Sequence, residues 1–162
     1  MGAHELAATL AAITEHQERL RAFLGAYEPR ALTQRPPSGE WSAIENVRHL
    51  ILAAQLHLGP FVAGGLGFSS LGLPQGIHPD TNASTDVPAV FAEWDRVHAS
   101  IHDRLDVSNP RVAVEVPRRG VRVLADQLPR FFRHQQAHGR LALRALSQVT
   151  GQPARLPRAS SR

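Results

Sequence analysis

Apolar residues recur every three or four positions along four long stretches of this 162-residue chain. That spacing places them on one face of an α-helix, because a helix turns once every ~3.6 residues. It predicts helices over residues 4–27, 43–58, 87–106 and 123–149. The apolar faces include Leu6, Leu10, Ile13, Leu20, Leu24 and Tyr27 in the first helix, Val90, Trp94, Val97, Ile101 and Leu105 in the third, and Leu124, Leu128, Phe131, Leu141 and Ala145 in the fourth. We therefore expect an all-α fold, an antiparallel four-helix bundle.

Capping and turn residues mark the ends of these helices. Pro29 is expected to end the first helix. Ser42 followed by Glu45 forms a capping box, in which each side chain bonds the backbone amide of the other residue, and it predicts the start of the second helix. Pro129 lies in the first turns of the fourth helix, which favours a later start, near 126–128.

The segments between the helices differ in character. Residues 59–86 are rich in Gly, Pro and Ser, and a connection this long is usually functional or disordered. We expect part of it to be helical or to cover a site. The alternation in RVAVEV, followed by Pro-Arg-Arg-Gly, predicts a short extended segment and a turn. We predict one domain over residues 1–150 and a disordered, arginine-containing tail over residues 151–162.

Composition excludes several kinds of chemistry. The chain has no Cys, so it cannot form a disulfide, a thiolate metal site or a cysteine nucleophile. All 18 basic residues are Arg, yet the tail carries three of them and no acid, which reduces the net charge from +4 to +1 for residues 1–150. A nearly neutral body without a helix-turn-helix argues against a nucleic-acid partner. No apolar run approaches the ~20 residues of a membrane span, and no signal peptide is evident, so we expect no membrane partner and a cytoplasmic protein.

Two of the histidines fall on the apolar face of the fourth predicted helix. His134 and His138 are four residues apart, so they stack on one helical face, three residues after Phe131 and three before Leu141. Burying two imidazoles costs free energy unless each finds a partner, and a divalent metal ion is one such partner. H-x-x-x-H alone is a weak signal, and a pair of satisfied or surface histidines stays open as the alternative.

His49 is a third candidate ligand. It shares a face of the second predicted helix with Leu52, Ala53 and Leu56, so it is also expected to point inward. Three imidazoles would leave coordination positions open for water or substrate. Five other histidines are expected to be solvated side chains: His4, His16, His78, His98 and His102.

Two segments together resemble a known family. The pattern Trp41-Ser42-x-x-Glu45-x-x-x-His49-Leu50 resembles the W-S/T-x-x-E-x-x-x-H-L signature of DinB-like proteins. Residues 117–141 resemble that family's P-x-x-G-x-x-T/V-L segment leading into H-x-x-x-H, and the order and spacing fit residues 4–149. The resemblance implies an up-down-down-up four-helix bundle, often dimeric, that holds a divalent metal ion (Zn, Ni, Fe or Mn) through His49, His134 and His138.

The resemblance also implies a range of functions. The family includes metal-dependent thiol S-transferases that use bacillithiol or mycothiol, a maleylpyruvate isomerase domain, and members with no assigned activity. We expect a divalent-metal-dependent enzyme, a thiol S-transferase or a related transferase or hydrolase, in which the metal activates a thiol or water. A non-catalytic metal- or ligand-binding stress-response module is the alternative. The expected partners are a small-molecule substrate, a low-molecular-weight thiol and a second copy of the chain.

The sequence leaves the roles of several residues near the expected site undecided. Many relatives carry Gln three residues after the last histidine, where this chain has Leu141. Glu45 either orients His49 or serves only the capping box, and capping is the favoured role. No general base is identified. The arginines near the expected site are either ligands for acidic groups of a thiol cofactor or solvated side chains; they are Arg48, Arg133 and Arg140.

Overall fold

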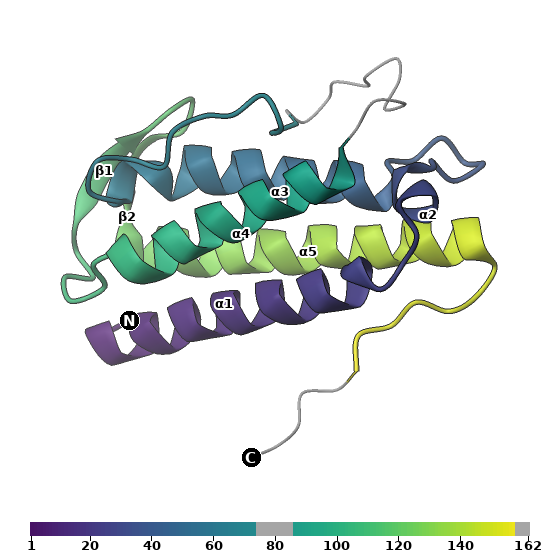
Figure 1. The fold of residues 1–162 in the computed structure, drawn as a ribbon. Coiled ribbons are helices and arrows are strands. Elements are labelled where there is room, and N and C mark those ends of the chain that lie inside the picture. Colours follow the sequence, from purple (N-terminus) through teal and green to yellow (C-terminus); the bar gives the residue numbers. More distant parts are fainter. Residues whose placement is uncertain (74–85, 158–162) are drawn as a thin grey trace.

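A computed structural model describes residues 1–73 and 86–157 of the chain. Its helices are α1 (Ala3–Gly25), α2 (Pro29–Thr33), α3 (Ala43–His57), α4 (Val87–Arg104) and α5 (Leu124–Thr150), with a 3-10 turn η1 (Gly59–Phe61) (Figure 1). Strands β1 (Ala113–Val116) and β2 (Gly120–Val123) form an antiparallel hairpin. The mostly helical fold confirms the predicted class, and the hairpin confirms the extended segment and its turn.

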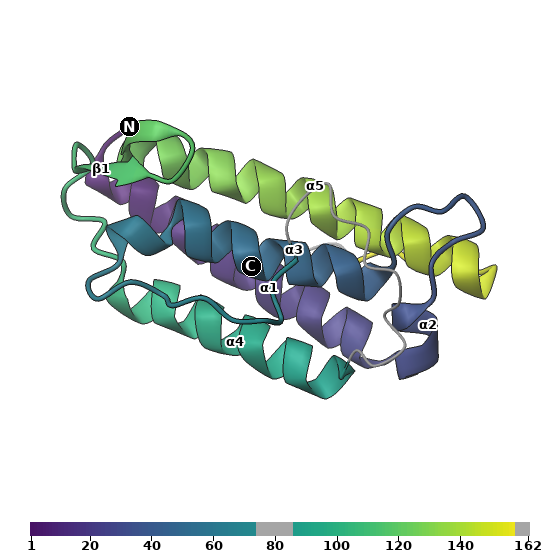
Figure 2. The ribbon, with the colours of Figure 1, turned by 90° about the horizontal axis from the view of Figure 1, so that it is seen from above.

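The four long helices surround one core. α3 packs against α5 and α4, and α1 packs against the same two helices (Figures 1 and 2). α1 and α5 run in one direction, and α3 and α4 run in the other. This arrangement puts α3 beside α5, although more than sixty residues separate them in the sequence.

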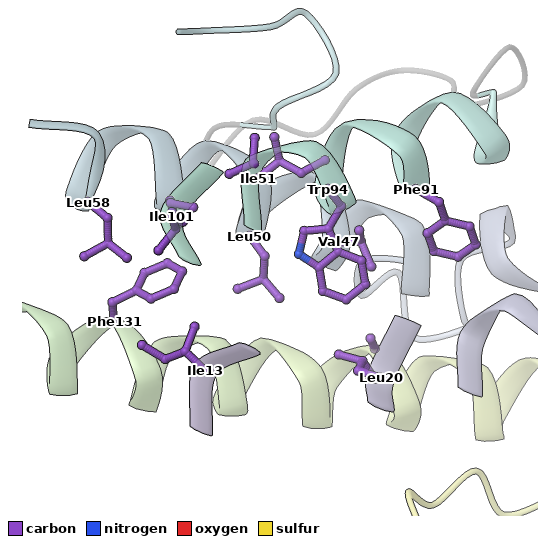
Figure 3. Close-up of a cluster of buried hydrophobic side chains, with 14 of the residues drawn as sticks. Ile13, Leu20, Val47, Leu50, Ile51, Leu58, Phe91, Trp94, Ile101 and Phe131 are labelled. Atoms are coloured by element: carbon purple, nitrogen blue, oxygen red, sulfur yellow. The ribbon is translucent and has the colours of Figure 1, made fainter. Parts of the chain in front are cut away.

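The core contains most of the residues that periodicity selected. Trp94 and Phe131 are its largest fully buried side chains, and aliphatic residues of all four helices surround them (Figure 3). Leu141 is an exception, because 41 % of it is exposed and Ala142 is buried in its place. Ten residues after Phe131, Leu141 is rotated about 80° away from it around the helix axis, and this turns it from the core.

The start of α5 agrees with the periodicity and not with the later start that Pro129 favoured. The helix begins at Leu124, next to the predicted start at residue 123 and not near 126–128, and Pro129 lies inside it. The amides of Leu124 and Ala125 donate to the carbonyls of Val112 and Pro110, both at 3.0 Å. Because the segment before β1 accepts these bonds, the helix starts more than one turn before the proline.

The short connections also show features that the prediction lacked. Pro29 does not simply end a helix: α1 ends at Gly25, and Pro29 is the first residue of α2, a position where its fixed φ is favourable. The predicted capping box at Ser42 is confirmed, with the Glu45 amide donating to Ser42 Oγ at 3.2 Å.

Two segments expected to be irregular make defined contacts. After η1, residues 62–73 return to α3, where the Leu73 amide donates to the Arg48 carbonyl at 3.0 Å. Beyond α5, Ala154 is buried and its amide donates to Ser147 Oγ at 2.8 Å. Within residues 151–157, buried Ala154 and part-buried Leu156 thus pack against the core and the other five are exposed, while 74–85 and 158–162 lie outside the described residues. No described helix is long and apolar enough to cross a membrane.

Candidate metal centre

Three histidines from two neighbouring helices meet at one point. α3 contributes His49, and α5 contributes His134 and His138. One ring nitrogen from each lies within 4.8 Å of the other two. His49 is buried, and the other two are half-buried. The sequence predicted that each of these histidines points inward from its helix. In the structure the three candidate ligands come together at one place.

A loop carbonyl fixes the orientation of His49. Its Nδ1 lies 3.1 Å from the carbonyl oxygen of Leu73. A carbonyl only accepts, so Nδ1 carries the proton and donates, which leaves a lone pair on Nε2. That Nε2 is 3.0 Å from His134 Nε2. Two imidazole nitrogens on one tetrahedral zinc ion, each ~2.0–2.1 Å from it, would lie about 3.3 Å apart, which is only slightly more than this distance.

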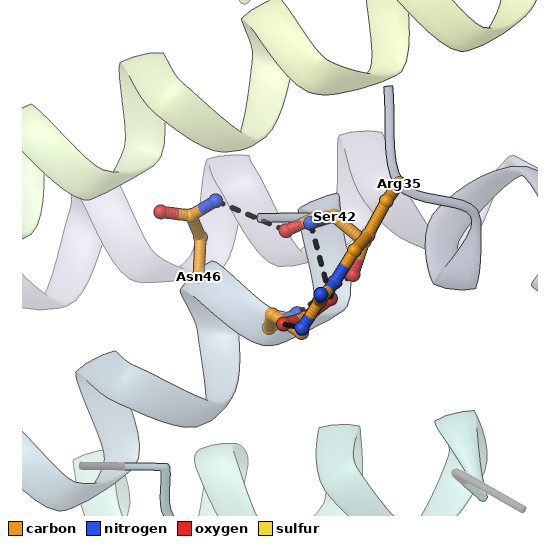
Figure 4. Close-up of polar contacts among 4 residues, drawn as sticks. Arg35, Ser42 and Asn46 are labelled. Carbon is orange, nitrogen blue, oxygen red and sulfur yellow. Dashed lines mark hydrogen bonds and ion pairs between the residues drawn. The ribbon is translucent and has the colours of Figure 1, made fainter. Parts of the chain in front are cut away.

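Asn46 fixes His138 in the same way. The amide nitrogen of Asn46 donates to the Ser42 carbonyl at 3.0 Å (Figure 4), so its Oδ1 faces the other way. This oxygen accepts from His138 Nδ1 at 2.9 Å. His138 therefore also presents an unprotonated Nε2. The two rings have the tautomers that metal ligation requires.

Burial keeps the three imidazoles neutral. Desolvation lowers the pKa of His49, and it lowers the pKa of His134 to about 4 and that of His138 to about 3. His49 adds to the shift of the other two, because one protonated ring disfavours a second nearby. At neutral pH each ring can therefore donate a lone pair without first losing a proton.

The N-terminal turn of α3 supports the site from one side. The Trp41 ring lies 5.5 Å from the His49 ring and 6.3 Å from the His138 ring, measured between centroids. Buried Glu45 accepts two 2.8 Å bonds from Arg35 (Figure 4), in addition to its capping bond. Glu45 therefore serves the helix start, and Leu73 orients His49.

Two cavities have histidines of the cluster in their walls. One, of about 510 Å³, has His49 and His134 in its wall together with the turn of the hairpin. The other, of about 180 Å³, is lined by His138, Trp41 and Leu141. The larger cavity therefore gives a small molecule access to His49 and His134, two of the three candidate ligands.

Sequence reasoning missed three groups at this site. Asn46 lies three residues before His49 on the same face of α3, a signal that spacing contained. His57 lines the larger cavity, with its ring centroid 6.2 Å from that of His134, and it follows His49 by two further four-residue steps. The Leu73 carbonyl had no signal, because a backbone group in an irregular segment leaves no side-chain pattern.

The other histidines and arginines that the sequence analysis considered do not join the histidine cluster. His98 is 3 % exposed and not solvated, because it faces Trp94 and Phe131 inside the helical core. Arg48 is fastened to the Leu71 carbonyl at 2.9 Å. Arg133 and Arg140 are exposed, and neither of them lines the two cavities beside the histidines. His78 falls outside the described residues.

Comparison with known proteins agrees with this geometry. The family model described as the DinB superfamily matches residues 12–142. No curated protein and no solved structure matches the chain. The matched range covers most of the sequence and includes His49, His134 and His138, together with the helices that carry them. The chain belongs to the DinB superfamily.

Proposed function

We propose that the protein binds a divalent metal ion through His49, His134 and His138 and acts as a metal-dependent enzyme on a small molecule. The observation that carries this proposal is the convergence of three neutral imidazoles within 4.8 Å, two of them held in the ligating tautomer. Imidazole nitrogens suit Zn, Ni and Fe, whereas Mn, which prefers oxygen ligands, is a candidate only through the family resemblance.

The cavity beside the histidines supports turnover more than a purely structural role. Structural zinc sites are closed by four protein ligands, whereas catalytic sites keep three and leave a position open. Here two of the three converging imidazoles, those of His49 and His134, line a cavity of about 510 Å³. A bound metal would supply Lewis acidity and lower the pKa of a coordinated thiol or water.

The reaction class we favour is thiol S-transfer. The chain has no Cys, so a reacting thiol must come from a cofactor, such as bacillithiol or mycothiol. His49, His134 and His138 would hold the metal, while Asn46 and the Leu73 carbonyl hold the rings in place. A related transferase or hydrolase using water would need the same residues.

The alternative is a non-catalytic metal- or ligand-binding module in a stress response. The same histidines would then serve only to bind the metal. The two functions differ in one observable, because only an enzyme consumes a thiol and an electrophile faster than the uncatalysed reaction.

The first experiment measures metal content. Wild type, His49→Ala and His138→Ala are reconstituted with Zn, Ni, Mn and Fe, desalted and examined by mass spectrometry. We expect about one equivalent in wild type and a large loss in both variants, with exposed His4→Ala as the matched control. Equal, low metal content in all four proteins would refute the site.

The second experiment measures turnover. The metal-loaded protein is mixed with an electrophile and either bacillithiol or mycothiol, and thiol loss is followed. Consumption above background in wild type, absent in His49→Ala, supports the transferase. Metal binding without any consumption favours the binding module.

Two further family properties are part of the proposal. The directions of the four long helices (Figures 1 and 2) support the up-down-down-up four-helix bundle. A homodimer is expected from the family, and light scattering on the purified chain tests it, with a mass of twice 17.7 kDa as the expected result.

A further inference from the structure

The β1–β2 hairpin brings three arginines to the larger cavity. Arg118, Arg119 and Arg122 line it together with residues of α3 and α5. None of the described lining residues carries a carboxylate. The cavity next to the histidines is therefore strongly positive.

These arginines differ from others on the same molecule. Arg21 and Arg96 pair with carboxylates at 3.2 and 2.7 Å. Within the part of the chain that the structure describes, the three hairpin arginines make no ion pair. The Nε of Arg122 is buried and has no hydrogen-bond partner there. A buried donor without a partner costs free energy, which an anion within reach of the Arg122 guanidinium would offset.

The turn of the hairpin adds a second observation. The Arg119 amide donates to the Val116 carbonyl at 2.9 Å, and Arg118 at the turn has a φ of 62°. Turns with positive φ at this position favour Gly, which has no Cβ, or Asn, whose side chain can hydrogen-bond the local backbone. A long cationic side chain stands at an unfavourable backbone position, and that side chain lines the cavity.

α3 adds apolar side chains to the lining of the cavity, which are Leu52, Ala53 and Leu56. A ligand that fills this space would contact both aliphatic and guanidinium groups. Guanidinium groups bind carboxylates and phosphates through paired hydrogen bonds.

We propose that Arg118, Arg119 and Arg122 form an anion-binding subsite beside the histidine cluster, which takes a small organic molecule with a carboxylate or phosphate group and an apolar body. This inference deepens the proposed function by naming the class of substrate or thiol cofactor. The subsite itself needs only the arginines, so its test does not require a metal ion.

His57, which also lines this cavity, contributes no charge at neutral pH. Burial, followed by the charge of Arg119, lowers the pKa of His57 to about 4. The positive charge of the cavity at pH 7 thus comes from guanidinium groups, which do not titrate in the usable range. We expect anion affinity to change little between pH 7 and pH 9.

The test is calorimetric titration of protein that has been stripped of metal with EDTA and then dialysed into chelator-free, metal-free buffer, with phenyl phosphate, benzoate and neutral benzyl alcohol. We expect both anions to bind and the alcohol to bind at least ten-fold more weakly, with affinity falling as salt rises. Arg119→Gln and Arg122→Gln should each weaken anion binding by about ten-fold, as expected for loss of a charged hydrogen bond. Exposed Arg111→Gln, which removes the same charge outside the cavity, should change affinity less than two-fold.

Arg118→Gly separates binding from folding. Glycine suits the positive φ, so the melting temperature should equal or exceed that of wild type while anion affinity falls. Equal affinity of all the arginine variants, or equal binding of benzyl alcohol and the anions, would overturn the subsite. A protein that binds phenyl phosphate but retains no metal would refute the proposed metal function and leave the subsite standing.

Discussion

At the scale of single residues, Asn46 decides which nitrogen of His138 faces the other two rings. It accepts from His138 Nδ1 at 2.9 Å, while its own amide group is held by the Ser42 carbonyl. Asn46→Ala should lower zinc affinity by about 10–100-fold, because loss of a hydrogen-bond partner frees the ligand ring to rotate and change tautomer. Competition with a chromophoric chelator measures this affinity.

Asn46→Asp is the matched variant. Its carboxylate still accepts from His138 Nδ1, so zinc affinity should stay within a few-fold of wild type or rise. If alanine and aspartate weaken zinc binding equally, Asn46 acts through packing and not through its oxygen.

His98 should make the folded state sensitive to acid. It is fully enclosed, its two ring nitrogens have no partner among the described residues, and His16 of α1 is the ionisable group that acts on it. Burial, and secondarily His16, lower its pKa to about 3. Below pH 6.5 the unfolded chain binds a proton there and the folded chain does not, so stability falls with acidity until pH nears 3.

His98→Leu tests this sign. Over pH 4–6, where unfolded histidine is largely protonated, the slope of unfolding free energy against pH should decrease by about 1.4 kcal/mol per unit relative to wild type. Urea denaturation of the metal-free protein at several pH values gives both slopes. An unchanged slope would mean that the folded protein protonates His98 as readily as the unfolded chain does.

At the scale of elements, the start of α3 depends on one buried carboxylate. Glu45 is completely buried, completes the capping box and pairs with Arg35, whose side chain is 31 % exposed. Glu45→Ala should lower the free energy of unfolding by about 2–3 kcal/mol, since it removes both interactions and water compensates Arg35 only partly. Chemical denaturation measures the loss.

Two variants separate these contributions. Glu45→Gln retains an oxygen for the Ser42 amide and should cost about 1 kcal/mol less than Glu45→Ala. Glu40→Ala breaks an exposed pair with Arg144, at 3.5 Å, and should change stability by less than about 0.5 kcal/mol. A loss at Glu40 as large as that at Glu45 would contradict the importance of burial.

At the scale of the whole molecule, a metal ion would join α3 to α5. His49 and His134 are 85 residues apart and meet only in the folded chain. Zinc should therefore stabilise the folded state by about 2.7 kcal/mol when free zinc is 100 times its dissociation constant, and EDTA should reverse the effect. Thermal unfolding with and without zinc measures the shift in melting temperature.

His134→Ala should abolish this shift, while His4→Ala should retain it because His4 is exposed and distant from the cluster in sequence. Equal shifts in wild type and His134→Ala would show that zinc binds elsewhere.

Much of the fold was predictable because helix patterns are local. Periodicity placed the four long helices to within a few residues, and Ser42 with Glu45 marked the start of α3. The start of α5 was not predictable from Pro129, because the bonds that begin the helix come from Val112 and Pro110. The helix propensity of a residue reflects only its own segment, whereas these hydrogen bonds depend on the position of another segment of the chain.

The sequence by itself determined which face of each helix is apolar, and it placed His134 and His138 on one side of α5. Only the tertiary structure decided that His49 meets them, that the Leu73 carbonyl orients it, and that His98 lies in the core. The tertiary structure also placed Arg118, Arg119 and Arg122 in the wall of the cavity that His49 and His134 line. The physical reason is that the spacing of residues in the sequence fixes the side of one helix on which each side chain lies. Which side chains of different helices and loops meet depends on how those elements pack.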